Sequence, residues 1–135
     1  MKKSLLLAAT AAAVIVLAGC GTTRPLITSS TYSVNSTPEA VKTAIGRSAI
    51  ARSFRIVSEK PGVTRLAYPA NARAAKYEMI VDVEYTGTTY TVNYVSSYGL
   101  DAAPCKNNPS QTCGHRNITR WIANLAKDIR GYLYK

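Results

Sequence analysis

Two cysteines in the C-terminal half and the single histidine are the residues whose types and spacing suggest chemistry. Cys105 and Cys113 are separated by seven residues, in a segment that Pro109 and Gly114 make easy to bend. In an oxidising compartment this spacing favours a disulfide bond, worth about 2–3 kcal/mol in the chain-entropy model. A metal site that includes His115 is the competing interpretation, but it lacks an obvious fourth ligand and a C-x₂-C pair. We therefore expect a disulfide bond, and neither a metal nor a cofactor, with free thiols as the remaining alternative.

His115 also carries a catalytic hypothesis. Nucleophilic catalysis needs a base beside a nucleophile and an acid that orients the base. Asp101 lies in the same segment, and Ser96, Ser97 and Ser110 are near in sequence. None of these serines lies in a nucleophile-elbow pattern. A small periplasmic hydrolase stays as an alternative, while the expectation is that the chain is not an enzyme.

Three acidic residues, Glu78, Asp82 and Glu84, fall on one face of a predicted strand. Same-face neighbours on a strand lie about 7 Å apart, but general acid–base catalysis would require their environments to differ. We expect them instead to face solvent and to pair with Arg55 or Arg65 on adjacent strands. The sequence also contains no phosphate-binding glycine loop, zinc signature or nucleotide fingerprint.

The first twenty residues differ in character from the rest of the chain. Lys2 and Lys3 precede an apolar run from Leu5 to Ala18, and small residues follow this run. This order is typical of a bacterial export signal. A membrane-spanning helix needs about 20 apolar residues, and this run is shorter. Two alternatives remain for this segment. It could be a retained transmembrane anchor, or a plain secretory signal followed by a structural Cys20.

The end of this segment, Leu17-Ala18-Gly19-Cys20, resembles the lipobox of bacterial lipoproteins. The resemblance implies cleavage before Cys20, a diacylglyceryl thioether on its sulfur and usually a third acyl chain, such as palmitate, on its amino group. Two or three chains hold a protein on a bilayer, whereas one binds marginally. In Gram-negative lipoproteins an aspartate in the next position favours the inner membrane, so Gly21 implies the outer membrane, with the domain facing the periplasm.

The length allows one folded domain. Of the 135 residues, 116 remain after removal of residues 1–19 as the signal peptide, which suffices for a single modest core. Residues 20–36 are rich in Ser and Thr, so we expect a lipidated N-terminus and tether there. Within the tether, residues 26–34 contain enough β-forming residues to dock as an edge segment. Residues 37–135 are expected to form the globular domain.

The helices are predicted by their caps and their periodicity. Thr37 can cap a helix and Pro38 suits the first helical position, and apolar residues then recur at spacings of three and four. A second helix is expected from about Asn117, as its cap, to Tyr132 or beyond. Its apolar stripe includes Trp121, the largest side chain available to anchor the core.

Between the helices the apolar pattern has a period of two, which is typical of strands with one covered face. The predicted strands cover residues 54–59, 63–68, 77–85 and 90–98. The inward row of the last strand is expected to run from Tyr90 to Tyr98, and residues 100–116 to be irregular. The predicted fold class is α+β, an antiparallel four-stranded meander with an N-terminal and a C-terminal helix packed on one face, in the order α-β-β-β-β-α.

The charge points to classes of partner. The formal net charge of +10 falls to +8 when Lys2 and Lys3 leave with the signal. A basic surface suits anionic partners, which outside the cytoplasm are lipid headgroups, lipopolysaccharide and wall polymers. An exported chain rarely meets nucleic acid, so no nucleic-acid partner is expected. The basic residues are dispersed and form no run of the length that marks an interaction tail.

The sequence therefore predicts a small lipoprotein of the cell envelope, held on the membrane by its lipid anchor. Its leading function is a non-enzymatic binding or scaffolding module with an envelope protein as partner. Binding of an anionic envelope polymer or lipid is the second hypothesis, and the hydrolase is the third.

Overall fold

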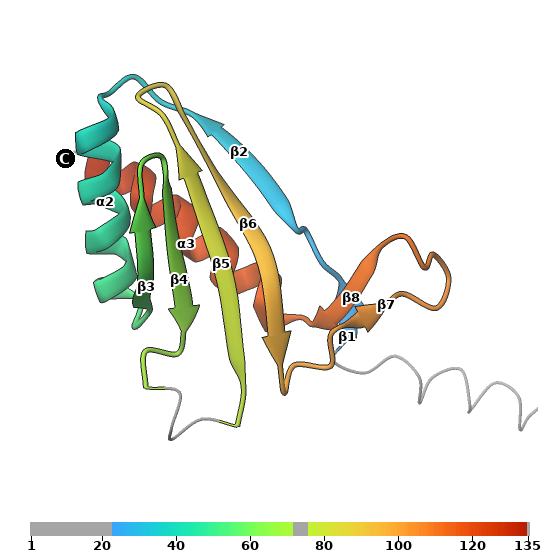
Figure 1. Ribbon diagram of the computed structural model, residues 1–135. Helices are drawn as coiled ribbons and strands as arrows, with labels where there is room; N and C mark the ends of the chain where they lie inside the picture. Colours follow the sequence, from blue (N-terminus) through green and yellow to red (C-terminus); the bar gives the residue numbers. More distant parts are fainter. Residues whose placement is uncertain (1–22, 72–75, 135) are drawn as a thin grey trace, which may run out of the picture.

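The computed structural model describes residues 23–71 and 76–134, which form an α+β domain (Figure 1). Cys20 and the lipobox lie outside these residues. The described part of the chain contains two helices and eight strands in two antiparallel sheets. In chain order the elements are β1 (Thr23–Pro25), β2 (Ser29–Ser33), α2 (Pro38–Ala51), β3 (Arg55–Lys60), β4 (Val63–Tyr68), β5 (Glu78–Tyr85), β6 (Thr89–Tyr98), β7 (Ala103–Pro104), β8 (Thr112–His115) and α3 (Asn117–Leu133).

The larger sheet has five strands in the order β2-β6-β5-β4-β3, so the prediction of a single four-stranded sheet was wrong. Strands β3 to β6 are joined by consecutive antiparallel hairpins, and β2 adds to the free edge of β6. This extra strand comes from the segment expected to be a tether. It docks as an edge strand, as its composition suggested, and the ring of Tyr32 stacks on that of Tyr90 at a centroid distance of 5.1 Å.

The second sheet is small and has the order β1-β8-β7. Residues 100–116 were expected to be irregular, and this was wrong for β7 and β8. These strands have two and four residues, too few for an alternating pattern to be visible in the sequence. Strand β8 pairs with β7 and also with β1, a segment far away in the chain, since Pro25 of β1 lies opposite Cys113 of β8.

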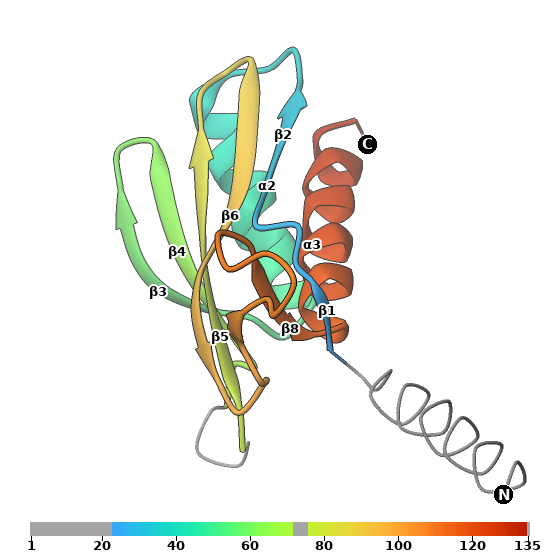
Figure 2. The same ribbon diagram turned by 90° about the vertical axis from the view of Figure 1, so that its right-hand side faces the viewer.

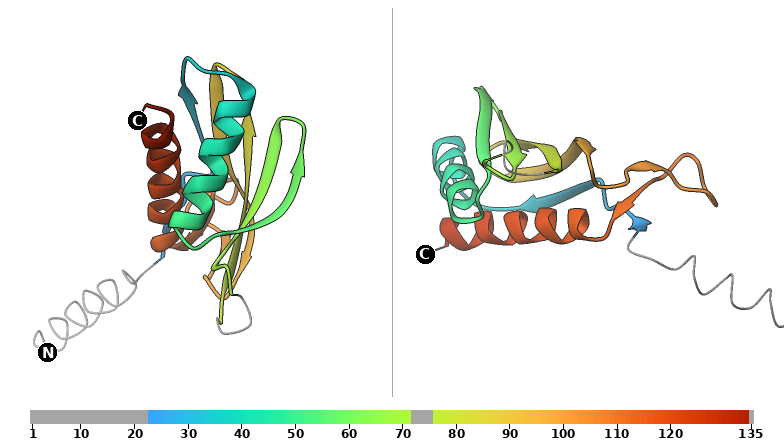
Figure 3. Two further views of the ribbon diagram at one scale, coloured as in Figure 1. Left: turned by 90° about the vertical axis from the view of Figure 1, so that its left-hand side faces the viewer. Right: turned by 90° about the horizontal axis from the view of Figure 1, so that it is seen from below.

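The helix arrangement also differs from the predicted one, because α2 follows two strands instead of opening the domain. Helix α2 packs along α3 and contacts β3, β4 and β5, while α3 contacts β6. Figures 2 and 3 show the helices side by side, with the strands of the larger sheet curving over the pair. The largest fully buried side chains lie between these layers: Ile45, Leu66, Met79, Tyr90, Ile118, Leu125 and Ile129.

The ends of the helices follow local chemistry. Thr37 caps α2 as predicted, because its hydroxyl oxygen accepts a hydrogen bond of 3.2 Å from the Ala40 N–H, and Pro38 begins the helix. The prediction of Asn117 as the cap of α3 was wrong by one position, since α3 already includes Asn117 and its N-cap is Arg116, which makes no capping bond with its side chain. Neither helix in the described ranges is long and apolar enough to cross a bilayer.

A β-bulge interrupts the pairing of β5 with β6. Val81 lies opposite Tyr94 but Ile80 lies opposite Ser96, so Val95 is the extra residue of the bulge. Because one extra residue reverses the face to which the following side chains point, the predicted inward row ends early. Tyr98, expected to point inward, is 55% exposed.

Candidate functional site

Cys105 and Cys113 form the predicted disulfide bond, with their Cα atoms 5.0 Å apart. The bond joins the residue after β7 to β8 and closes the loop between them. Both thiols that the metal interpretation required are therefore bonded to each other and are not available as metal ligands. Among residues 23–71 and 76–134, no group of three or more His, Cys, Asp or Glu side chains is placed to hold a metal ion.

His115 has a structural role at the start of α3. Its Nδ1 atom accepts a hydrogen bond of 3.1 Å from the backbone N–H of Asn117. The first N–H groups of a helix have no partner within the helix, so a side-chain acceptor at this place caps it. This explains why α3 begins there although the N-cap residue itself makes no capping bond with its side chain.

The residues of the hydrolase hypothesis are not brought together. The hydroxyl of Ser97 hydrogen bonds with that of Tyr94 at 2.7 Å, and the hydroxyl of Ser110 donates to the side chain of Asn108 at 2.6 Å. Within the described ranges, the ring of His115 makes no hydrogen bond to a serine or to an aspartate. The third candidate serine, residue 96, is exposed on β6.

Two of the three acidic residues on β5, Glu78 and Asp82, pair with arginines, as the sequence predicted. Nε and Nη2 of Arg65 donate to the two carboxylate oxygens of Asp82 at 2.7 and 2.8 Å, and Nη2 of Arg55 lies 3.4 Å from Oε2 of Glu78. The hydrogen bonds from Arg65 lower the pKa of the Asp82 carboxyl. Both carboxylates are held by arginines on a polar outer face of the sheet, so they do not resemble a general acid–base pair.

A groove that sequence reasoning missed lies where the C-terminal end of α2 meets the end of β4 and the first half of α3. We call it the α2–α3 groove. Its volume is about 320 Å³. It is lined by Ala51, Arg52, Ser53, Phe54, Tyr68, Trp121 and Asn124.

The end of α2 shapes one wall of the α2–α3 groove. The N–H of Ser53 donates to the carbonyl oxygen of Ile50 at 3.2 Å, and the N–H of Phe54 donates to that of Ala49 at 2.8 Å. This pair of bonds is a Schellman motif, which requires a left-handed residue after the helix, and Ser53 has φ 61°. The turn sends Phe54 into the core, where it is 6% exposed.

Four aromatic rings, Phe54, Tyr68, Tyr77 and Trp121, form what we call the aromatic cluster, and all of them except Tyr77 line the groove. The Tyr68 ring lies 5.1 Å from that of Phe54 and 4.6 Å from that of Trp121 between centroids. Tyr77 stacks on Trp121 at 5.6 Å, with 13° between the ring planes. Burial raises the pKa of the Tyr68 hydroxyl. Since Tyr68 and Trp121 are half-buried and line the groove, part of each ring is open to a ligand.

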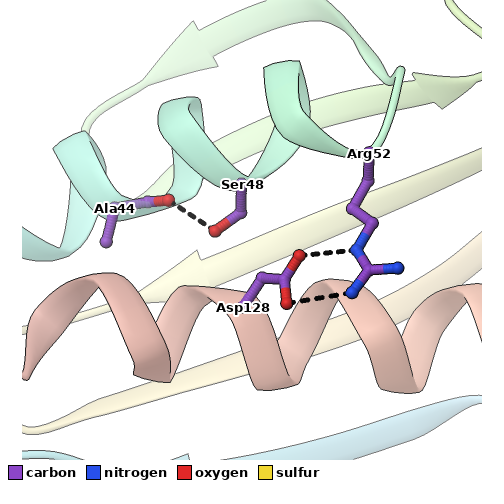
Figure 4. A network of polar contacts seen from close by, with 4 residues as sticks. All are labelled: Ala44, Ser48, Arg52 and Asp128. Atoms are coloured by element: carbon purple, nitrogen blue, oxygen red, sulfur yellow. Dashed lines mark hydrogen bonds and ion pairs between the residues drawn. The ribbon is translucent and has the colours of Figure 1, made fainter.

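Polar groups form the other wall of the groove. Nε and Nη2 of Arg52 donate to Asp128 Oδ2 and Oδ1 at 2.5 and 3.2 Å, which fixes the guanidinium across the two helices (Figure 4). Within the described part of the chain, Nη1 of Arg52 and the half-buried side-chain amide of Asn124 make no hydrogen bond. The α2–α3 groove therefore combines open aromatic surface with polar groups that have hydrogen bonds to offer.

Trp121 is the residue whose sequence signal could have indicated the groove. Its place on the apolar stripe of the last helix suggested a core anchor, but the structure leaves it half-buried at the edge of the core. Asn124 lies three residues later, which places both side chains on the same side of α3. An amide three residues after a tryptophan does not by itself indicate a binding site. It does so only once α2 and β4 are known to lie beside both side chains.

Three larger hollows lie elsewhere, of about 540, 490 and 460 Å³. The first lies beside the start of α2 and the β3–β4 turn, the second surrounds the disulfide loop, and the third lies between α2 and the end of α3. None of the ring pairs among the described residues lines any of them. Comparison with known proteins adds no further guide, because no protein-family model and no curated protein matches the chain significantly.

Proposed function

We propose that this chain is a lipid-anchored protein of the bacterial cell envelope that acts as a non-enzymatic binding module. In this proposal Cys20 carries the acyl chains, Gly21 directs the protein to the outer membrane, and the α2–α3 groove holds the ligand. The observation that carries the proposal is the disulfide bond between Cys105 and Cys113, because such bonds persist in oxidising spaces outside the cytoplasm. The export signal and the lipobox resemblance point to the same location.

The position of β1 supports a short connection to the membrane. Thr23 begins β1, three residues after Cys20. An extended chain spans at most about 3.6 Å per residue, so the first residue of the small sheet would lie within roughly 11 Å of the Cα atom of the acylated Cys20. In this arrangement the disulfide, which holds β7 against β8, would stabilise the part of the domain nearest to the bilayer.

A binding role is supported by how the reactive side chains are used. His115 caps α3, and the two cysteines of the domain are joined to each other. The open hydrogen-bonding groups of Arg52 and Asn124 lie beside aromatic rings, an arrangement suited to holding a ligand.

The test is the chemical state of Cys20 in a Gram-negative host. Mass spectrometry of the purified chain should find an N-terminal peptide that begins with an acylated Cys20, and the protein should sediment with outer membranes. A Cys20→Ser variant should lose both properties. The matched control is the double variant Cys105→Ser with Cys113→Ser, which should keep the acyl chains. An unmodified Cys20 on the wild-type chain would overturn the proposal.

A second variant tests the sorting step. Gly21→Asp should keep the acyl chains on Cys20 but move the protein to the inner-membrane fraction. Retention of the variant in the outer membrane would contradict the role given to Gly21 without affecting the role given to Cys20.

A further inference from the structure

We propose that the α2–α3 groove binds an uncharged pyranose ring of a glycan, the kind of sugar ring found in polysaccharides of the cell wall. This inference rests on the proposed function, since the envelope location makes such a glycan accessible. The juxtaposition that carries it is an aromatic surface, from Tyr68 and Trp121, beside two polar groups, Nη1 of Arg52 and the amide of Asn124, that have no hydrogen-bond partner among the described residues.

The aromatic side of the groove suits one face of a sugar. A pyranose presents a flat patch of C–H groups, and removing such apolar surface from water is favourable. The rings are also held in place before any ligand arrives. Tyr77 stacks on Trp121 at 5.6 Å, and Tyr68 is fixed between Phe54 and Trp121. A ligand therefore loses little free energy in ordering them.

The polar side of the groove suits the hydroxyl groups of the same sugar. The amide of Asn124 offers both a donor and an acceptor, and Nη1 of Arg52 offers two N–H donors. Because Nε and Nη2 of Arg52 are held by Asp128, the guanidinium keeps its orientation while Nη1 remains available. Sugar hydroxyls can donate and accept, so they match such a mixed set.

Charge favours a neutral ligand over an anionic one. The positive charge of Arg52 is offset by the carboxylate of Asp128 at 2.5 Å, and the other residues that line the groove are uncharged. An anionic polymer would gain little net attraction here. It would bind instead through the dispersed basic residues of the surface, and such binding weakens steeply with salt.

Size favours one ring or two over a long ligand. The volume of about 320 Å³ is at the lower end of the range of about 300–1,000 Å³ for small-ligand sites. A proline-rich peptide also docks on aromatic rings, but it needs an extended groove with successive pockets. A single compact hollow therefore fits a sugar ring better than a polyproline helix.

The single tryptophan of the chain is a direct probe of this site. The experiment titrates the full chain, in a detergent that has no sugar headgroup, with triacetylchitotriose and separately with cellotriose. Fluorescence excited selectively at tryptophan, together with calorimetry, reports binding. We expect a saturable change in Trp121 emission with at least one of these neutral oligosaccharides, and a dissociation constant that salt hardly affects.

Two variants connect the signal to the groove. Asn124→Ala should weaken binding at least tenfold, and Trp121→Ala should abolish the calorimetric signal. Trp121→Phe, which keeps an aromatic ring in the core, covers the case in which Trp121→Ala fails to fold, and it should bind more weakly than wild type. The matched control is Tyr98→Ala, because Tyr98 is a 55% exposed aromatic residue outside the groove, and its binding should be unchanged.

Several results would overturn this inference. Absence of a saturable signal with both oligosaccharides on the folded wild-type chain is one. Binding that Asn124→Ala leaves unchanged, binding only to a proline-rich peptide, and retention only on an anionic polymer with loss at high salt are others. The acylation of Cys20 is measured separately. If no sugar binds, the lipid-anchored envelope location still stands, and if Cys20 is not acylated, sugar binding can still be measured.

Discussion

The hydroxyl of Tyr90 donates a hydrogen bond of 2.7 Å to the carbonyl oxygen of Ala126, and this bond joins the start of β6 to α3 inside the core. Tyr90 is fully buried, and Tyr32 of the edge strand stacks on its ring. One side chain therefore connects β2, β6 and α3. The helix that carries Trp121 and Asn124 depends on this contact for its position over the sheet.

Replacing Tyr90 by phenylalanine tests this connection. Tyr90→Phe keeps the ring but removes the hydroxyl, so it should lower the free energy of unfolding by about 1 kcal/mol, the usual net value of a buried hydrogen bond. Urea denaturation followed by circular dichroism measures the change. Tyr98→Phe on the exposed end of β6 is the control and should change stability little. An unchanged midpoint for Tyr90→Phe would mean that the bond to Ala126 contributes nothing.

The same residue predicts a loss of stability in alkali. Burial raises the pKa of Tyr90 to about 12, above its ordinary value of 10.0. Between these values an unfolded chain releases the proton while the folded chain keeps it. The stabilisation from the neutral hydroxyl is therefore complete below pH 10 and is lost as the pH rises towards 12. Melting temperatures measured across this window should fall for wild type and fall less steeply for Tyr90→Phe. Parallel curves for the two proteins would contradict the assignment.

The elements with strong local signals could be predicted from the sequence. Thr37 and Pro38 marked the start of α2, and the alternation from Met79 to Tyr85 marked a half-buried strand. The pair formed by Arg65 with Asp82 also followed, because these residues lie directly opposite each other in the pairing of β4 with β5. Arg55 reaches Glu78 from β3, with β4 between the two strands, so this pair followed from opposite charge and a shared face. These signals lie within a few residues or in the register of strands that follow one another in the sequence.

The features that the sequence did not predict depend on contacts between distant segments. Residues 26–34 were expected to dock as an edge segment, but the partner strand and the contact of Tyr32 with Tyr90 depend on distant residues, and β1 has no partner until β8 lies beside it. The bulge at Val95 reverses the later side chains of β6, at a place where Tyr94 and Val95 are followed by Ser96 and Ser97 and the local alternation no longer indicates a face. The α2–α3 groove exists only where three elements meet, so neither Trp121 nor Asn124 indicated it alone.

The left-handed serine at the end of α2 predicts a stabilising substitution. Ser53 has φ 61°, which costs a residue with a side chain about 1 kcal/mol and costs glycine almost nothing. Ser53→Gly should therefore raise the free energy of unfolding by up to about 1 kcal/mol. Ser53→Ala keeps the conformational cost and is the control, with little expected change. A decrease for Ser53→Gly in urea denaturation would show that the hydroxyl stabilises this turn.

A buried hydroxyl on β4 predicts a second stabilising change. Thr64 is 1% exposed, and its Oγ1 has no hydrogen-bond partner among the described residues. Burying such a group without a partner is costly, so a methyl group in its place should be better accommodated. Thr64→Val should raise the free energy of unfolding by about 1 kcal/mol, as measured by calorimetry. Thr64→Ser keeps the hydroxyl, removes the methyl group and should destabilise. A Thr64→Val protein less stable than wild type would imply a partner for the hydroxyl in solution.

Two glycines predict opposite responses to the same substitution. Gly99 has φ 70°, and a Cβ atom there would overlap the carbonyl oxygen of Lys76 and lie 3.0 Å from Cα of Tyr77. Because the obstacle is backbone, Gly99→Ala should destabilise by more than about 2 kcal/mol and displace Tyr77 from Trp121. Gly46 in α2 has nothing within 4 Å of the same atom, so Gly46→Ala should stabilise by about 1 kcal/mol through helix propensity. Urea denaturation of both variants, with tryptophan emission as the probe, measures both effects. If Gly99→Ala leaves emission and stability at wild-type values, the close approach of residue 99 to Lys76 and Tyr77 does not support the aromatic cluster.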